Sequence, residues 1–263
     1  MSTAEQAPAA PVSVAKNLKV SDLTAALAAG WGDFKAHPAF GLFFAAIYVG
    51  AGIFLYFALF VRGEIFWLVP AAAGFPLLAP FVAVGLYEVS RRREAGMPMS
   101  WRAVLGALRG HGDEQIISMG VILFVAFGFW LMIAHGIFAI FLAESGLASE
   151  SMELFRTPAG IAMLVVGSFF GALIALAFYA ITVASLPMLV DREVDFITAI
   201  IVSLATVRSN KRVMLIWAAA IATTLFVAML PFFLGLFIVL PVLGHATWHL
   251  YRRSVSQSGP QAV

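Results

Sequence analysis

Long runs of apolar residues constrain this chain more than any other feature. A helix needs about 20 such residues, at about 1.5 Å each, to cross the hydrocarbon of a bilayer. Six stretches meet this requirement: residues 39–61, 65–86, 116–142, 160–190, 213–230 and 232–250. Because hydrocarbon offers no partner to a bare peptide group, the stretches must be helical. The sequence therefore predicts an all-α polytopic membrane protein with six transmembrane helices.

The division between the fifth and sixth stretches depends on Pro231. Without it, residues 213–250 would form one helix of roughly 57 Å, nearly twice the hydrocarbon thickness. Three more prolines fall in the second stretch, at positions 70, 76 and 80. Proline interrupts helix hydrogen bonding, so the second transmembrane helix is expected to be kinked or broken.

Composition supports a membrane protein and excludes several kinds of site. Hydrophobic residues make up 62% of the chain and charged residues 11%, too few to cover a water-facing surface. Without cysteine, the chain has no disulfide, thiolate metal site or catalytic thiol. The net charge of +2 is too small to indicate a nucleic-acid partner.

The basic residues indicate the orientation. With both termini in the cytoplasm, every lysine and arginine except Arg62 and Arg156 falls in a cytoplasmic segment. Flanking positive charges stay on the cytoplasmic side of a membrane. An even number of spans is required for this distribution.

A short segment with helical periodicity precedes each odd-numbered span. Leu23, Trp101 and Ile197 come 16, 15 and 16 residues before the starts of these spans at positions 39, 116 and 213. We interpret the chain as three hairpins, each preceded by a cytoplasmic amphipathic helix in the membrane plane. Chance amphipathic stretches in cytoplasmic loops are the alternative. Residues 1–20 are expected to be a disordered tail, 21–251 one six-helix domain and 252–263 a cytoplasmic tail.

None of the spans contains Asp, Glu, Lys or Arg in its interior, which argues against a proton relay or a carboxylate ion site. His245 and His249 lie one helical turn apart, a spacing that suits a metal or a haem ligand. His135 falls toward the opposite leaflet. The simpler interpretation places the pair in an interfacial aromatic belt beside Trp248 and Tyr251, and no metal or cofactor is assigned.

No catalytic motif is present, so no catalytic residue is assigned and no enzymatic activity is expected. The hydroxyls nearest mid-membrane belong to four residues: Tyr48, Ser168, Thr223 and Thr224. Such hydroxyls usually bond to backbone carbonyls within the bundle rather than to a substrate.

Two groups of residues suggest partners. Basic clusters follow the second and sixth spans: Arg91, Arg92, Arg93, Arg252 and Arg253. They are expected to anchor the topology and to meet anionic lipid headgroups, with an acidic protein partner as an alternative. Small residues recur every four positions in the fourth span: Gly167, Gly171 and Ala175. Such a face allows close packing, either within the bundle or against a partner protein.

Three segments carry a family resemblance: residues 30–38 (GWGDFKAHP), 85–94 (GLYEVSRRRE) and 186–193 (LPMLVDRE). With them, residues 20–255 resemble a family of uncharacterised proteobacterial integral membrane proteins, a domain of unknown function. Some members are labelled cytochrome c oxidase subunit I, which would need more spans and more histidine ligands than this chain has. The resemblance implies a bacterial inner-membrane location.

Two functions remain open. The first is a non-enzymatic accessory or assembly protein of a larger, plausibly respiratory, inner-membrane complex. The second is a transporter or lipid-handling protein for an uncharged or amphiphilic substrate, built from three parallel hairpin repeats.

Overall fold

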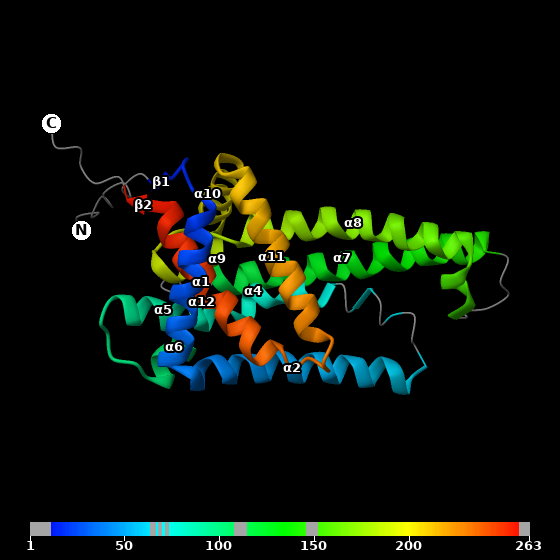
Figure 1. Cartoon of the computed structure of the whole chain (residues 1–263), viewed down its shortest axis with the longest axis horizontal. Coiled ribbons are helices and arrows are strands. Elements are labelled where there is room, and N and C mark those ends of the chain that lie inside the picture. Colours follow the sequence, from blue (N-terminus) through cyan, green and yellow to red (C-terminus); the bar gives the residue numbers. More distant parts are fainter. Residues whose placement is uncertain are drawn as a thin grey trace, which may run out of the picture.

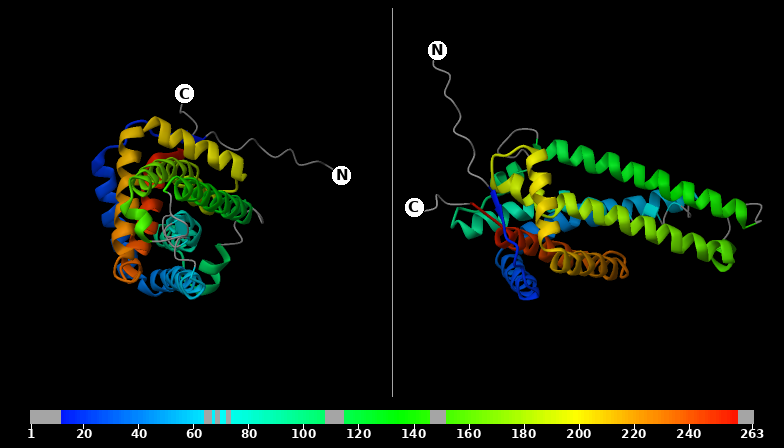
Figure 2. Two further views of the ribbon diagram at one scale, coloured as in Figure 1. Left: turned by 90° about the vertical axis from the view of Figure 1, so that its right-hand side faces the viewer. Right: turned by 90° about the horizontal axis from the view of Figure 1, so that it is seen from above.

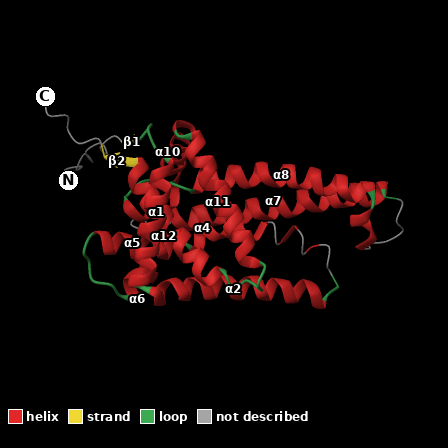
Figure 3. Ribbon diagram, viewed as in Figure 1, coloured by secondary structure: helices red, strands yellow, loops and turns green. Residues whose placement is uncertain are grey.

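The computed structural model describes residues 12–63, 67, 70–71, 74–107, 115–145 and 152–257. The described part is almost entirely helical, with one pair of short strands (Figure 3). A compact end holds both ends of the described chain, and three long helices extend from it in roughly one direction (Figure 1). These are α2 (Pro38–Val61), α7 (Gln115–Glu144) and α8 (Pro158–Thr182).

Local sequence determines where these helices begin. Pro38 is at the start of α2, where proline's missing N–H costs no hydrogen bond. In α8, Pro158 follows Thr157, whose hydroxyl accepts the Gly160 N–H at 3.0 Å. Such a cap satisfies one of the unpaired amides at a helix start.

Four described helices are long and apolar enough to cross a membrane: α2, α7, α8 continued by α9 (Ser185–Asp191), and α11 (Lys211–Met229). No more than 28% of the most apolar window of any of them is buried within the chain. Large apolar side chains such as Phe54, Phe124 and Val165 are instead exposed. Soluble proteins rarely expose apolar surface on this scale. The exposed apolar side chains therefore support an all-helical membrane protein.

The count of six helical spans is not confirmed. In place of a second long helix, the described residues form a 3₁₀ turn (Phe75–Leu78), α4 (Ala79–Val82) and α5 (Val84–Glu94). The start of that expected span, including residues 65 and 66, lies outside the described residues. The proline-induced break is confirmed in the described part.

The expected sixth span corresponds to α12 (Leu236–Ser254), which is not among the four candidate spans. Its second half carries polar residues, including two histidines and Arg252, and most of it is buried within the protein. The three-hairpin arrangement is therefore a prediction that the fold does not confirm.

The compact end is built on the packing of α12 against α1 (Val20–Ala36). A Cβ on Gly30 would lie 2.5 Å from the Ala246 backbone nitrogen, so only glycine permits this approach of the two backbones. In Figure 1, α1 runs across the direction of α2, α7 and α8.

Helices are present at all three positions where an amphipathic helix was expected: α1, α6 (Trp101–Gly106) and α10 (Phe196–Ser209). Ser100 caps α6 and Asp195 caps α10. Like α1, α10 lies across the long axis of the molecule (left view of Figure 2). Their location in the membrane plane remains a prediction.

The two ends of the described chain meet in a small sheet. Strand β1 (Val12–Val14) pairs antiparallel with β2 (Val255–Gln257). Part of each expected tail is therefore ordered as a strand, while residues 1–11 and 258–263 lie outside the described part. The pairing places both ends on the same side of the molecule.

Candidate functional site

A layer of polar side chains joins four helices at the compact end. It is centred on α5, and its members come from α1, α5, α9 and α12: Asp33, Glu88, Ser90, Arg91, Arg92, Arg93, Glu94, Asp191, His245, His249, Tyr251 and Arg252. We call this set the polar layer. Segments far apart in the sequence, including all three that carry the family resemblance, meet there.

Asp33 connects three of the helices. Its Oδ2 accepts the Ser90 hydroxyl at 2.6 Å and lies 2.8 Å from His249 Nε2, while its Oδ1 pairs with the Arg93 guanidinium. The carboxylate is almost wholly buried, and all three partners favour its charged form. Asp33 therefore joins α1 to α5 and α12.

The electrostatics of Asp33 follow from these contacts. Burial alone would raise the pKa of a carboxyl group. The hydrogen bonds from His249, Ser90 and Arg93 outweigh burial and lower the pKa of Asp33 from 3.8 to about 2. Asp33 is thus ionised at any physiological pH.

The two histidines whose spacing suits a metal or haem ligand contact different side chains. His245 Nδ1 lies 2.8 Å from Ser90 Oγ, and its Nε2 has no hydrogen-bond partner among the described residues. His249 instead contacts Asp33. His135 stacks on Trp67 with ring centroids 4.2 Å apart. Within the described residues, no group of three histidine or acidic side chains is placed to hold a metal ion.

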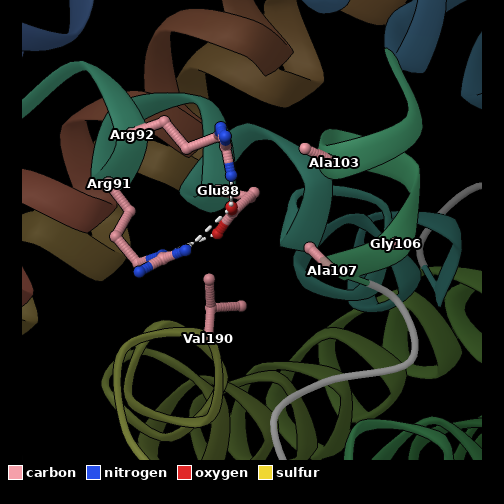
Figure 4. Close-up of a pocket in the computed structure, with 7 residues that line it drawn as sticks. All are labelled: Glu88, Arg91, Arg92, Ala103, Gly106, Ala107 and Val190. Atoms are coloured by element: carbon pink, nitrogen blue, oxygen red, sulfur yellow. Dashed lines mark hydrogen bonds and ion pairs between the residues drawn. The ribbon is translucent and has the colours of Figure 1, made fainter. Parts of the chain in front are cut away.

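Glu88 forms the second centre of the polar layer (Figure 4). Arg91 donates two hydrogen bonds to its carboxylate, at 2.6 and 2.9 Å, and Arg92 donates one at 3.2 Å. A cavity of about 230 Å³ lies beside them, lined also by α6 and by Val190 of α9. The carboxylate already has three charged hydrogen bonds, so it needs no further partner.

Arg252 links the remaining carboxylates. It donates to Glu94 at 3.1 Å and to Asp191 at 3.3 Å. Asp191 also accepts the Tyr251 hydroxyl at 2.8 Å, and Glu94 accepts the Trp248 indole N–H at 3.0 Å. These contacts connect α12 to α5 and α9.

All five arginines that were expected to meet lipid headgroups have a carboxylate partner within the chain. Arg91, Arg92, Arg93 and Arg252 belong to the polar layer, and Arg253 pairs with Asp22 at 3.3 Å. The structure thus gives these charges an internal role. Whether they also contact lipid remains a prediction.

A second feature lies among the apolar helices. A cavity of about 420 Å³, here called the apolar cavity, is bounded by α8, α11, α12 and residues 77–87. Its walls carry no charged side chain and include many small residues, among them Ala175, Ala218, Ala222 and Gly244.

The small-residue face of α8 is divided between three environments. A Cβ on Gly171 would lie 2.9 Å from the Trp130 ring of α7, so this position packs within the chain. Ala175 lines the apolar cavity. At Gly167 no atom lies within 4 Å of such a Cβ, so this part of the face is open.

Two of the mid-membrane hydroxyls bond to backbone carbonyls, as expected. Tyr48 donates to the Phe75 carbonyl at 2.8 Å, and Thr224 donates to the Ala220 carbonyl at 2.6 Å.

Sequence reasoning missed the central residues of the polar layer. Asp33, Glu88, Ser90 and Asp191 were not identified as a site, although each falls in a segment that carried the family resemblance. The shared location of these residues in the resemblance segments was the only sequence feature that pointed to them. Their mutual contacts depend on how α1, α5, α9 and α12 pack, which local patterns do not specify.

Comparison with known proteins gives one match. Residues 68–191, a little under half of the chain, match the model of a family described as "Predicted integral membrane protein (DUF2189)". No curated protein and no solved structure matches the chain. The matched range contains α5 and nearly all of the 186–193 segment, and therefore two of the three segments that meet in the polar layer. The expected resemblance to an uncharacterised family of integral membrane proteins is thereby confirmed.

Proposed function

We propose that the protein is a non-enzymatic membrane protein that binds a membrane amphiphile in the apolar cavity. The observation that carries this proposal is the cavity itself, which has about 420 Å³ of space between apolar helices. This volume falls in the range of about 300–1,000 Å³ that is typical of ligand sites. Of the two functions that the sequence left open, the lipid-handling one accounts for this space.

The cavity walls suit a hydrocarbon chain. Hydroxyls that line the cavity already donate to carbonyls of the helices: Thr182 to Phe178 at 2.7 Å, and Thr247 to Leu243 at 2.8 Å. Such walls offer an occupant apolar contact and require few hydrogen bonds in return. Because a lipid chain leaves hydrocarbon when it enters the cavity, its binding depends on close packing with these walls rather than on removal from water.

One lining group favours an amphiphile over a pure hydrocarbon. Tyr87 lines the cavity and is only 2% exposed. Its hydroxyl can donate a hydrogen bond to a polar group of an occupant, and a pure hydrocarbon offers no such group.

The proposal is tested by filling the cavity. Ala222→Phe places a ring in the cavity, whereas Thr223→Phe adds the same ring at the next residue, outside the cavity lining. We expect lipid to remain bound to the purified wild-type protein and to the Thr223 variant, and to be lost from the Ala222 variant. Native mass spectrometry of protein in mild detergent measures this. Equal lipid retention in all three proteins would contradict the proposal.

A specific observation also favours the accessory role. The most apolar window of α8 with α9 is only 11% buried, and the open position at Gly167 lies on α8. A partner helix could pack closely there. Gly167→Leu would then remove a stoichiometric co-purifying membrane protein, whereas Gly136→Leu, at a similarly open glycine of α7, would not. Loss of the partner in both variants, or in neither, would count against this interface.

We also propose that the protein lies in the bacterial inner membrane with both termini in the cytoplasm. The distribution of lysine and arginine supports this orientation. The pairing of β1 with β2 agrees with it, because both ends of the described chain then lie on one side. Protease accessibility of a C-terminal tag in inverted and right-side-out vesicles tests the orientation.

A further inference from the structure

Three basic side chains gather where α10 ends and α11 begins: Arg208, Lys211 and Arg212. We call this group the basic corner. All three are exposed, and none forms an ion pair with another residue that the structure describes. They differ in this respect from the paired arginines of the polar layer.

The basic corner is held in place by Asn210. Its side-chain amide donates to the Ala15 carbonyl at 2.7 Å, and its Oδ1 accepts the Leu18 N–H at 3.1 Å. These bonds attach the corner to the chain segment before α1. The charges are therefore carried by a fixed backbone.

The register of α11 connects the basic corner to the apolar cavity. Leu215, Ala218 and Ala222 line the cavity and share one face of the helix. Lys211 and Arg212 lie four and three residues before Leu215, and so continue that face by one turn toward the helix start. Long basic side chains lean toward the N-terminus of their helix and extend to the interface. Their charges are thus placed beyond one end of the cavity.

The neighbouring helix α10 indicates where the basic corner lies relative to the membrane. Ile197, Ile201 and Leu204 follow helical spacing along one face and are 58%, 60% and 37% exposed. The opposite face, which includes Ala199 and Ser203, is buried against the protein. An exposed apolar face on a helix that crosses the long axis suits the boundary between headgroups and acyl chains.

From these observations we infer that the occupant of the apolar cavity is an anionic phospholipid, with one acyl chain in the cavity and its net negative headgroup held by Lys211 and Arg212. This inference rests on the proposed function and adds the headgroup class and the residues that select it. Opposite charge and position support the assignment, because no described residue forms an ion pair with these two cations and both continue the cavity face of α11. The arginines of the polar layer, which have carboxylate partners, are not assigned to this headgroup.

The test compares headgroups that share the same acyl chains. Delipidated full-length protein in mild detergent is titrated with phosphatidylglycerol and with phosphatidylcholine, and bound lipid is counted by native mass spectrometry. Lys211→Gln with Arg212→Gln removes the two proposed contacts. The control, Arg62→Gln with Arg156→Gln, removes two exposed charges elsewhere.

We expect the wild-type protein and the control variant to bind phosphatidylglycerol about 30-fold more tightly than phosphatidylcholine. This ratio takes about 1 kcal/mol for the attraction of each of the two cations to the anionic headgroup. The Lys211 and Arg212 variant should lose this preference and still bind phosphatidylcholine. Equal binding of both lipids by the wild-type protein, or an equal loss in the control, would overturn the inference and leave the proposed function standing. If neither lipid binds, or if Ala222→Phe does not displace bound lipid, the proposed function itself fails.

Discussion

Replacing Asp33 by asparagine removes the charge of the carboxylate that joins α1, α5 and α12, while keeping its size. Ser90, Arg93 and His249 all favour the ionised form. Asparagine cannot accept from all three with the same strength, because charged hydrogen bonds are about twice as strong as neutral ones. The variant should fold less stably at neutral pH.

The magnitude follows from the pKa of Asp33, which is lowered from 3.8 to about 2. At about 1.4 kcal/mol for each pKa unit, the charged form contributes about 2.5 kcal/mol to folding. Because the folded-state pKa lies below the unfolded value, this stabilisation is complete above about pH 4 and is lost as pH falls through about 2. The wild-type protein and Asp33→Asn should therefore differ at neutral pH and converge in strong acid.

Thermal unfolding in mild detergent, followed by tryptophan fluorescence, measures the difference. A loss of about 2.5 kcal/mol lowers the midpoint by roughly 5–10 °C, by the scaling found for soluble domains of similar size. Asp22→Asn is the matched control. Asp22 pairs with the exposed Arg253, and such pairs contribute about 1 kcal/mol or less. Its carboxylate also accepts the Lys19 N–H at 2.8 Å, which the oxygen of an asparagine side chain can accept as well. A shift at Asp33 no larger than at Asp22, or one that persists unchanged near pH 2, would refute the reasoning.

Two further variants test the compact end by the same thermal measurement. Gly30→Ala places a methyl group 2.5 Å from the Ala246 nitrogen and should lower the free energy of unfolding by about 1–3 kcal/mol, because it forces α1 and α12 apart. Gly32→Ala, whose Cβ would meet nothing closer than 3.6 Å, should be nearly neutral. Equal losses of stability in the two variants would contradict the close packing at Gly30. Glu88→Gln should cost about 3 kcal/mol because it leaves two arginines at a buried site without their carboxylate. Glu94→Gln, at a side chain that is 41% exposed, should cost about 1 kcal/mol or less. A larger loss of stability at Glu94 than at Glu88 would contradict the reasoning from burial.

The local features of the fold were predictable because they depend on neighbours in the sequence. Apolar runs of sufficient length predicted α2, α7, α8 and α11 as membrane helices. Prolines predicted the break before α5. Such patterns act within a few turns of one helix, so they can be recognised without knowledge of the fold.

The prediction for α12 shows why the contacts between helices could not be predicted from local sequence patterns. Its residues are apolar enough, with those of its preceding turn, to suggest a sixth span. In the structure, α12 packs closely on α1 and directs His245 and His249 at partners on other helices. Hydropathy measures only the preference of a segment for an apolar environment, and a buried protein interior meets that preference as well as lipid does.

The sequence by itself determined that this chain is an all-helical membrane protein, because so many apolar stretches of about 20 residues cannot all be shielded from water within one chain. It also located three short helices. Only the tertiary structure decided that Asp33, Glu88 and Asp191 pair with arginines inside the chain, whereas none of the described acidic residues pairs with Lys211 or Arg212. The physical reason is that pairing depends on distances between side chains on different helices, which only the packing of those helices sets.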